Sequence, residues 1–243
     1  MFSATAFAPS LFGELLGAAQ RAGYAFARFD AVPASGKVFF MRHDVDISPA
    51  GARLLGRLAH EQGAVSNFFF QLNAETYTIL SDEVLGIMRE LQRQGHCVGL
   101  HIDQKRFGED ERTIARTIEW FSSCVMPVDA VVSFHRPAPS VVGKGYAAFV
   151  NAYDPRFFNP DCYLSDSRRS LAFLPKLGQW IAAGRPLIQL LLHPEWWCGI
   201  DDDLGVWTEL RERRTHELAH YVTTNFAKVF HHVVAAETRD FRI

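Results

Sequence analysis

Short apolar runs alternate along the chain with longer segments in which apolar positions recur at helical spacing. The apolar runs predict buried strands at 38–41, 65–72, 97–100, 130–134 and 187–192. The segments between them predict helices at 11–22, 49–61, 82–94, 109–124 and 170–183, and a long helix at 207–236 near the end of the chain. Ser48 before Pro49, and Ser81 before Asp82, are typical helix starts.

Strands that alternate with helices are expected to pair in parallel, because a parallel crossover needs a connection of helix length. The strands are apolar throughout, which indicates that helices or other strands cover both of their faces. These features predict an α/β fold, either a barrel or a doubly wound sheet. No repeat, linker or low-complexity stretch interrupts the chain, so we predict a single domain over residues 1–243.

The composition limits the classes of function. Of the 243 residues 48% are hydrophobic and 20 are Phe, which is enough for a large core and argues against disorder. A net charge of −2 gives no indication of binding to nucleic acid. No apolar run approaches the ~18 residues of a membrane span, and the first residues do not resemble a secretion signal. We therefore predict a cytoplasmic protein, and four scattered cysteines agree with a reducing compartment.

Polar side chains collect where the predicted strands end. In parallel α/β folds the carboxyl ends of the strands share one face, and that face holds the active site. We therefore expect four segments that are distant in sequence to converge there: Arg42-His43-Asp44-Val45-Asp46, His101-Ile102-Asp103, His135-Arg136 and His193-Pro194-Glu195.

The first of these segments carries two aspartates on one side of an extended chain, since Asp44 and Asp46 are two residues apart. Two carboxylates so close favour a cation between them. Imidazoles of His101 and His135 would complete a nitrogen and oxygen site suited to zinc or a similar divalent ion. A buried cluster of ion pairs, with arginines neutralising the aspartates, is the alternative at this point.

Read in order, five segments resemble the five motifs of the NodB-homology polysaccharide deacetylases, a superfamily that includes carbohydrate esterase family 4. The resemblance spans about residues 38–194 and is greatest to a divergent branch found in O-antigen and capsule gene clusters. Its motifs are Arg42-His43-Asp44-Val45-Asp46, Gly95-His96-Cys97-Val98-Gly99-Leu100-His101, Phe134-His135-Arg136-Pro137, Ser165-Asp166-Ser167 and Leu190-Leu191-Leu192-His193-Pro194.

The resemblance implies a distorted (β/α) barrel of about seven parallel strands, one bound metal ion, and hydrolysis of an N-acetyl group by water. It assigns the general base to Asp44 and the general acid to His193. It implies that Arg136 orients the base, and that Asp166 supports the site through Arg136 or His193.

The metal ligands implied by the resemblance are Asp46 and His101. Here the sequence departs from the family, because Val45 separates the base from the metal aspartate, and Lys105 occupies the position of the second metal histidine. A protonated lysine is a poor ligand, so we expect His135 to be the third one. Asp103 is a further candidate, as a ligand or as a partner of His101.

Together with the resemblance, these residues predict metal-dependent deacetylation of an N-acetylated sugar intermediate of O-antigen or capsule-type polysaccharide biosynthesis, with zinc as the expected metal. The substrate would be a sugar nucleotide, a lipid-linked sugar or an oligosaccharide. Two alternatives stay open: a barrel that binds carbohydrate without hydrolysing it, which Lys105 favours, and a hydrolase of another C–N amide bond.

Other side chains near the strand ends have weaker assignments. Leu190 and Leu192 are candidates for a slot that holds the acetyl methyl group. Trp196 and Trp197 suit either a sugar face or lid packing. The sequence His216-Glu217-Leu218-Ala219-His220 matches the HExxH pattern of metalloproteases, but a strongly charged stretch precedes it, and we interpret it as an exposed helix face.

Overall fold

The structure is a computed structural model that describes residues 2, 6–197, 199–200 and 202–240, with 230–240 as backbone alone. Two compact units make up the chain, Met1–Ile200 and Asp201–Ile243. The prediction of one domain over residues 1–243 stays a prediction. Among the described residues, no helix has the length and apolar character needed to cross a membrane.

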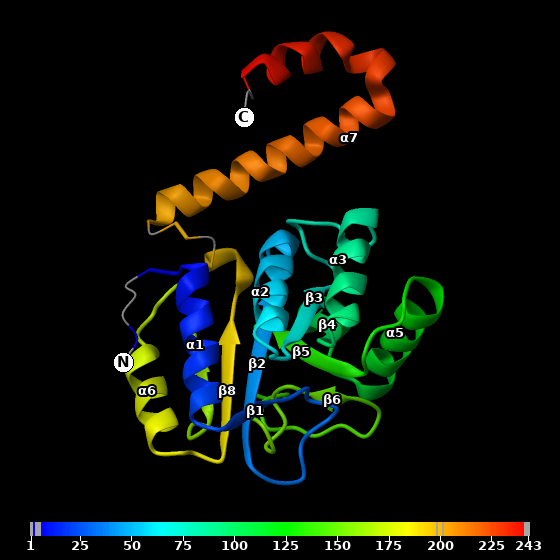
Figure 1. The fold of residues 1–243 in the computed structure, drawn as a ribbon. Coiled ribbons are helices and arrows are strands. Elements are labelled where there is room, and N and C mark those ends of the chain that lie inside the picture. Colours follow the sequence, from blue (N-terminus) through cyan, green and yellow to red (C-terminus); the bar gives the residue numbers. More distant parts are fainter. Residues whose placement is uncertain (1, 3–5, 198, 201, 241–243) are drawn as a thin grey trace. The chain divides into compact units, whose positions relative to one another are not determined.

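The first unit is built on one sheet whose strand pairs are all parallel (Figure 1). Seven strands follow the order β6-β5-β4-β3-β2-β8-β7 and curl into half of a barrel, and β1 pairs with β2 beside this path. The predicted α/β fold with about seven parallel strands is therefore confirmed. The strands are β1 (Tyr24–Phe26), β2 (Lys37–Val45), β3 (Asn67–Gln71), β4 (Cys97–Asp103), β5 (Val131–His135), β6 (Val150–Asn151), β7 (Tyr163–Ser165) and β8 (Leu187–Leu192).

Helices cover the outer face of this sheet, as the apolar strands predict. Ser48 Oγ accepts a hydrogen bond from the Gly51 backbone N–H, and Ser81 Oγ accepts one from Val84, which confirms both predicted helix starts. The helix expected at 170–183 begins later, at Leu174. The helices of this unit are α1 (Pro9–Arg21), α2 (Pro49–Glu61), α3 (Asp82–Arg93), α4 (Gln104–Phe107), α5 (Glu111–Cys124), α6 (Leu174–Ala182) and the short 3₁₀ helix η1 (Pro194–Trp196).

Strand β2 separates the core from the candidate site through its alternating side chains. Phe39 and Met41 belong to an apolar cluster with the helices, whereas Phe40 belongs to a second cluster with residues of β3, β4 and β5. Arg42 and Asp44 share the side of Phe40. On this side of β2, the residues near the carboxyl end of the strand are therefore polar, and those near its amino end form an apolar layer.

The apolar layer inside the curled sheet is made mainly of aromatic rings. Phe29 and Phe40 stack with centroids 4.7 Å apart, and Phe157 packs edge-on against both of them. Gly99 of β4 has no room for a side chain here, because a Cβ would lie 2.2 Å from the Val131 carbonyl oxygen. The layer fills the barrel below the ionisable residues and supports them.

The second unit consists mainly of α7 (Asp203–Asp240), slightly longer than the expected helix at 207–236. Its backbone leaves helical geometry at Phe226, with φ −130° and ψ 25°. His216 and His220 of the HExxH pattern are exposed on α7, and Glu217 Oε2 accepts a hydrogen bond of 2.8 Å from Arg214. These features agree with an exposed helix face.

Candidate active site

A buried ion pair forms the floor of the site. The Arg42 guanidinium donates two hydrogen bonds to the Asp44 carboxylate, Nε to Oδ1 at 3.0 Å and Nη2 to Oδ2 at 2.7 Å. Arg42 is fully buried and Asp44 is 3% exposed. The two residues are two positions apart on β2, so their side chains extend to the same side and meet in this bidentate pair.

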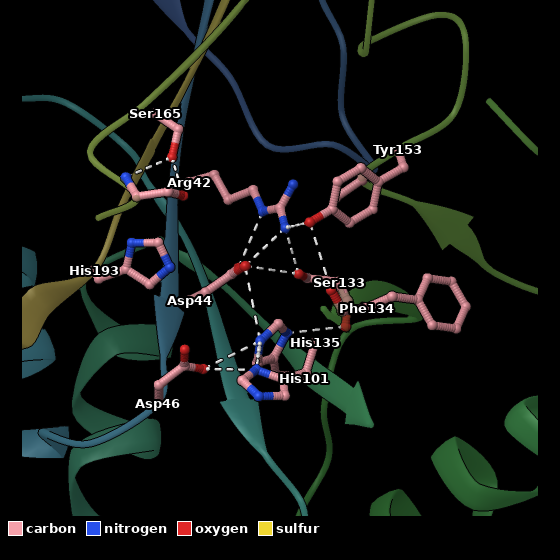
Figure 2. A network of polar contacts seen from close by, with 12 residues as sticks. Arg42, Asp44, Asp46, His101, Ser133, Phe134, His135, Tyr153, Ser165 and His193 are labelled. Atoms are coloured by element: carbon pink, nitrogen blue, oxygen red, sulfur yellow. Dashed lines mark hydrogen bonds and ion pairs between the residues drawn. The ribbon is translucent and has the colours of Figure 1, made fainter. Parts of the chain in front are cut away.

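Three further side chains hold the buried guanidinium. Arg42 Nη2 lies 2.6 Å from Ser133 Oγ and 2.7 Å from Tyr153 Oη (Figure 2). Arg42 Nη1 lies 3.2 Å from Gln189 Oε1. Ser133 Oγ in turn donates to Asp44 Oδ2 at 3.1 Å. Ser133, Tyr153 and Gln189 were absent from the sequence prediction, and no local motif marks them.

The resemblance implies that Arg136 orients Asp44, but in the structure another arginine contacts this carboxylate. Arg136 is exposed, just beyond the end of β5, where its backbone has a positive φ of 48°. Arg42, on the same strand and side as Asp44, makes the contact instead.

Charge and burial act in opposite directions on Asp44. Burial raises the pKa of this carboxyl, but the Arg42 guanidinium and the nearby His101 lower it more, so the pKa lies below its ordinary value. Asp44 is therefore ionised at neutral pH and able to accept a proton.

Asp46, His101 and His135 meet beside this pair. Asp46 Oδ1 lies 3.2 Å from His101 Nε2 and 3.3 Å from His135 Nδ1, and the two ring nitrogens are 3.2 Å apart (Figure 2). The three residues come from the ends of β2, β4 and β5. The predicted convergence of Asp46, His101 and His135 is thus present in the structure.

This triangle has the donor types and the size of a divalent metal site. Two imidazoles and a carboxylate are ligands that zinc accepts, and ligand atoms at ~2.0–2.1 Å around a tetrahedral ion lie about 3.3–3.4 Å apart. His101 Nδ1 lies 3.0 Å from the Ser133 carbonyl oxygen. Donation to that oxygen leaves Nε2 with a free lone pair toward Asp46. The group could therefore hold a metal ion.

Lys105, which occupies the position of the family's second metal histidine, and Asp103, the further candidate ligand, lie outside this triangle. Lys105 is exposed in α4. Asp103 Oδ1 accepts the Lys105 backbone N–H at 2.9 Å and caps α4, and its Oδ2 lies 3.4 Å from Asn73 Nδ2. Asp103 therefore has a local structural role, outside the group formed by Asp46 and the two histidines.

A second ion pair lies at the end of β8. His193 Nδ1 lies 2.6 Å from Asp166 Oδ1, while Asp166 Oδ2 accepts from the His193 backbone N–H and from Trp197 Nε1, both at 2.9 Å. Burial lowers the pKa of His193, but the hydrogen bond and charge of Asp166 outweigh it and raise the pKa to about 9. Asp166 was expected to support the site through either Arg136 or His193, and in the structure it contacts His193.

Trp197 and the leucines of β8 belong to the core. Trp197 is fully buried and packs edge-on against Phe7 at 5.4 Å. Leu190 and Leu192 lie in the same apolar cluster as α1 and α6, on the outer face of the sheet. The expectation of an acetyl slot at these leucines is wrong, since alternate residues of β8 face opposite sides and Gln189 faces the site.

Glu195 is a further acidic residue at the site to which the sequence prediction gave no role. It lies on η1, which packs against β2 and α2, and it is 3% exposed. Burial, and after it the charge of Asp46, raise the pKa of Glu195 to about 8. The sequence placed Glu195 near the site, in the His193-Pro194-Glu195 segment, but it did not indicate that this side chain is buried.

Comparison with known proteins gives little beyond the geometry. No protein-family model matches the chain, and no curated protein matches it. Among solved structures, the chain is similar to the Streptococcus pyogenes deacetylase PplD in complex with acetate. That similarity covers 77% of this chain and 84% of the other, at 12% sequence identity and a TM-score of 0.39.

Proposed function

We propose that this protein is a metal-dependent hydrolase that removes the acetyl group from an N-acetylated sugar. The observation that carries the proposal is the juxtaposition of the Asp46, His101 and His135 triangle with an ionised carboxylate, Asp44. A divalent ion, which we propose to be zinc, would polarise the amide carbonyl and make bound water more acidic.

The chain's own residues would carry the two proton transfers of amide hydrolysis. Asp44 is held in one orientation by Arg42 and Ser133, and in its ionised form it takes the proton of the attacking water. His193 is protonated below about pH 9 and gives its proton to the departing amine nitrogen. The charges of His193 and Asp44 act on each other's pKa, so acid and base serve one site.

We further propose that the substrate is an intermediate of O-antigen or capsule-type polysaccharide biosynthesis, acted on in the cytoplasm. The resemblance of the five motifs between residues 38 and 194 to the O-antigen and capsule branch of the polysaccharide deacetylases supports this choice of substrate. The partner is then a sugar nucleotide, a lipid-linked sugar or an oligosaccharide that carries an acetamido group, with no role for nucleic acid.

The experiment that tests this function is an acetate-release assay with the Zn²⁺-loaded full chain and a panel of such N-acetylated sugars. We expect stoichiometric acetate and free amine from at least one substrate, and loss of both in Asp44→Asn. An N-formyl analogue in the same panel separates deacetylation from hydrolysis of another amide. Binding of the sugars without release of acetate would favour the non-hydrolytic barrel and contradict the proposal.

The pH dependence of kcat/KM follows from His193. The acid is active when protonated, so kcat/KM is expected to fall as pH rises through about 9. Removing the negative charge of Asp166 with Asp166→Asn lowers the pKa of His193 and is expected to move this limb by about 1–3 units to lower pH. A descending limb that stays in place in Asp166→Asn, with the fold intact by circular dichroism, would exclude His193 as the acid.

A further inference from the structure

Four acidic groups surround the candidate site, and two of them have a basic partner in the fold. Asp44 is paired with the Arg42 guanidinium at 2.7 Å. Asp166 is paired with His193 at 2.6 Å. Asp46 Oδ1 lies 3.2 Å from His101 Nε2 and 3.3 Å from His135 Nδ1, but these imidazoles must be neutral to bind a metal ion and then give Asp46 no positive charge. Glu195 forms no ion pair with any of the described residues.

These two carboxyl groups also hold buried oxygens that no donor satisfies within the described chain. Asp46 Oδ1 lies near two ring nitrogens but accepts no hydrogen bond, and Glu195 Oε2 accepts none either. A buried carboxyl oxygen without a donor is costly. Of the charged groups around Glu195, Asp46 acts on it most strongly. The negative charge of Asp46 alone repels the Glu195 carboxylate, whereas a cation beside Asp46 would attract it.

We propose that Glu195 supplies the second negative charge of the divalent-cation site, from outside the Asp46, His101 and His135 ligands. Two uncompensated carboxylates then match one ion of charge +2, and the site as a whole is neutral. Glu195 is a positioning residue in this scheme, because it acts on the ion through the electrostatic field and through bound water. The inference deepens the proposed function and rests on its metal site.

Calorimetric titration of the metal-free full chain with Zn²⁺ alone tests the inference. We expect Glu195→Gln, which keeps the shape and removes the charge, to weaken zinc binding by about tenfold to a hundredfold. Glu195→Asp keeps the charge and is expected to recover part of this loss. Asp129→Asn is the matched control: its carboxylate caps the amino end of β4 through Val98 N at 2.7 Å, and its zinc affinity is expected to equal that of the wild type.

Two outcomes would overturn the inference. The first is a wild-type protein that binds no Zn²⁺. The second is a Glu195→Gln protein that binds Zn²⁺ with wild-type affinity, while circular dichroism shows that the variant and the wild type are both folded. Acetate release is measured on the same samples and answers a separate question. Zinc binding that depends on Glu195, without acetate release from any substrate, would support this inference and contradict the proposed function. Acetate release from at least one substrate, together with wild-type zinc affinity in Glu195→Gln, would support the proposed function and contradict this inference.

Discussion

Asp46→Asn is expected to abolish stoichiometric zinc binding and to lower the rate of acetate release by about a thousandfold. Asp46 contributes the only carboxylate of the three-residue group, and its Oδ1 is within 3.3 Å of both ring nitrogens. Asparagine has nearly the same shape but carries no charge. The expected loss therefore reports the ion's electrostatic contribution rather than a change in packing.

Metal analysis of the purified variant and the acetate assay together check this expectation. His101→Ala should give the same two losses, because its Nε2 completes the triangle with His135. Asp129→Asn serves again as the control and should keep both zinc and activity. An Asp46→Asn protein that retains one equivalent of zinc and wild-type activity would show that the metal lies elsewhere.

The sequence predicted these three residues because a general rule of parallel sheets applies to them. Asp46 directly follows β2, His101 lies two residues before the end of β4, and His135 is the last residue of β5. The strands β4 and β5 are neighbours in the sheet. The side chains meet at the edge of the sheet where the carboxyl ends of the parallel strands lie. The alternation of side chains along β2 determines which face of the sheet its aspartates are on. Both can be read from short apolar runs followed by ionisable residues.

The partner of Asp44 could not be predicted in the same way. Arg42 and Arg136 both follow from the motifs, and both were available to neutralise an aspartate. The choice depends on which arginine fits into the barrel with Ser133, Tyr153 and Gln189, and these come from β5, a loop and β8. Such a set depends on three-dimensional packing, which one sequence does not contain.

The shortest strands were also missed, and for a simple reason. β1, β6 and β7 have two or three residues each, too few to display any periodicity. They are nevertheless important for the site, since Tyr153 and Asp166 follow β6 and β7 closely in sequence. Sequence patterns therefore located the long central strands and left the edges of the sheet undefined.

Arg42→Met is expected to lower the free energy of unfolding at pH 7 by about 3–5 kcal/mol. Methionine fills much of the same volume, but it leaves the Asp44 carboxylate, 3% exposed, without its cation and two of its donors. Asp44 then keeps its charge at a high cost or takes up a proton. Chemical denaturation followed by circular dichroism measures the change.

The pH dependence of this loss identifies its cause. In the wild type the pKa of Asp44 is lowered, so the pair's stabilisation is present above the unfolded-state pKa and is lost as pH falls through the folded-state pKa. Without Arg42 the carboxyl binds its proton more readily, and the difference between variant and wild type should therefore shrink in acid. Adding Asp44→Asn to Arg42→Met should recover part of the stability at pH 7.

Arg53→Met is the matched control for burial. Arg53 also pairs with a carboxylate, Glu90 at 3.3 Å, but its side chain is 44% exposed, and a surface pair contributes about 0–1 kcal/mol. A loss in Arg42→Met as small as that in Arg53→Met would mean that the buried pair does not stabilise the fold. A large loss that is constant from pH 7 into acid would point to packing rather than to the charge of Asp44.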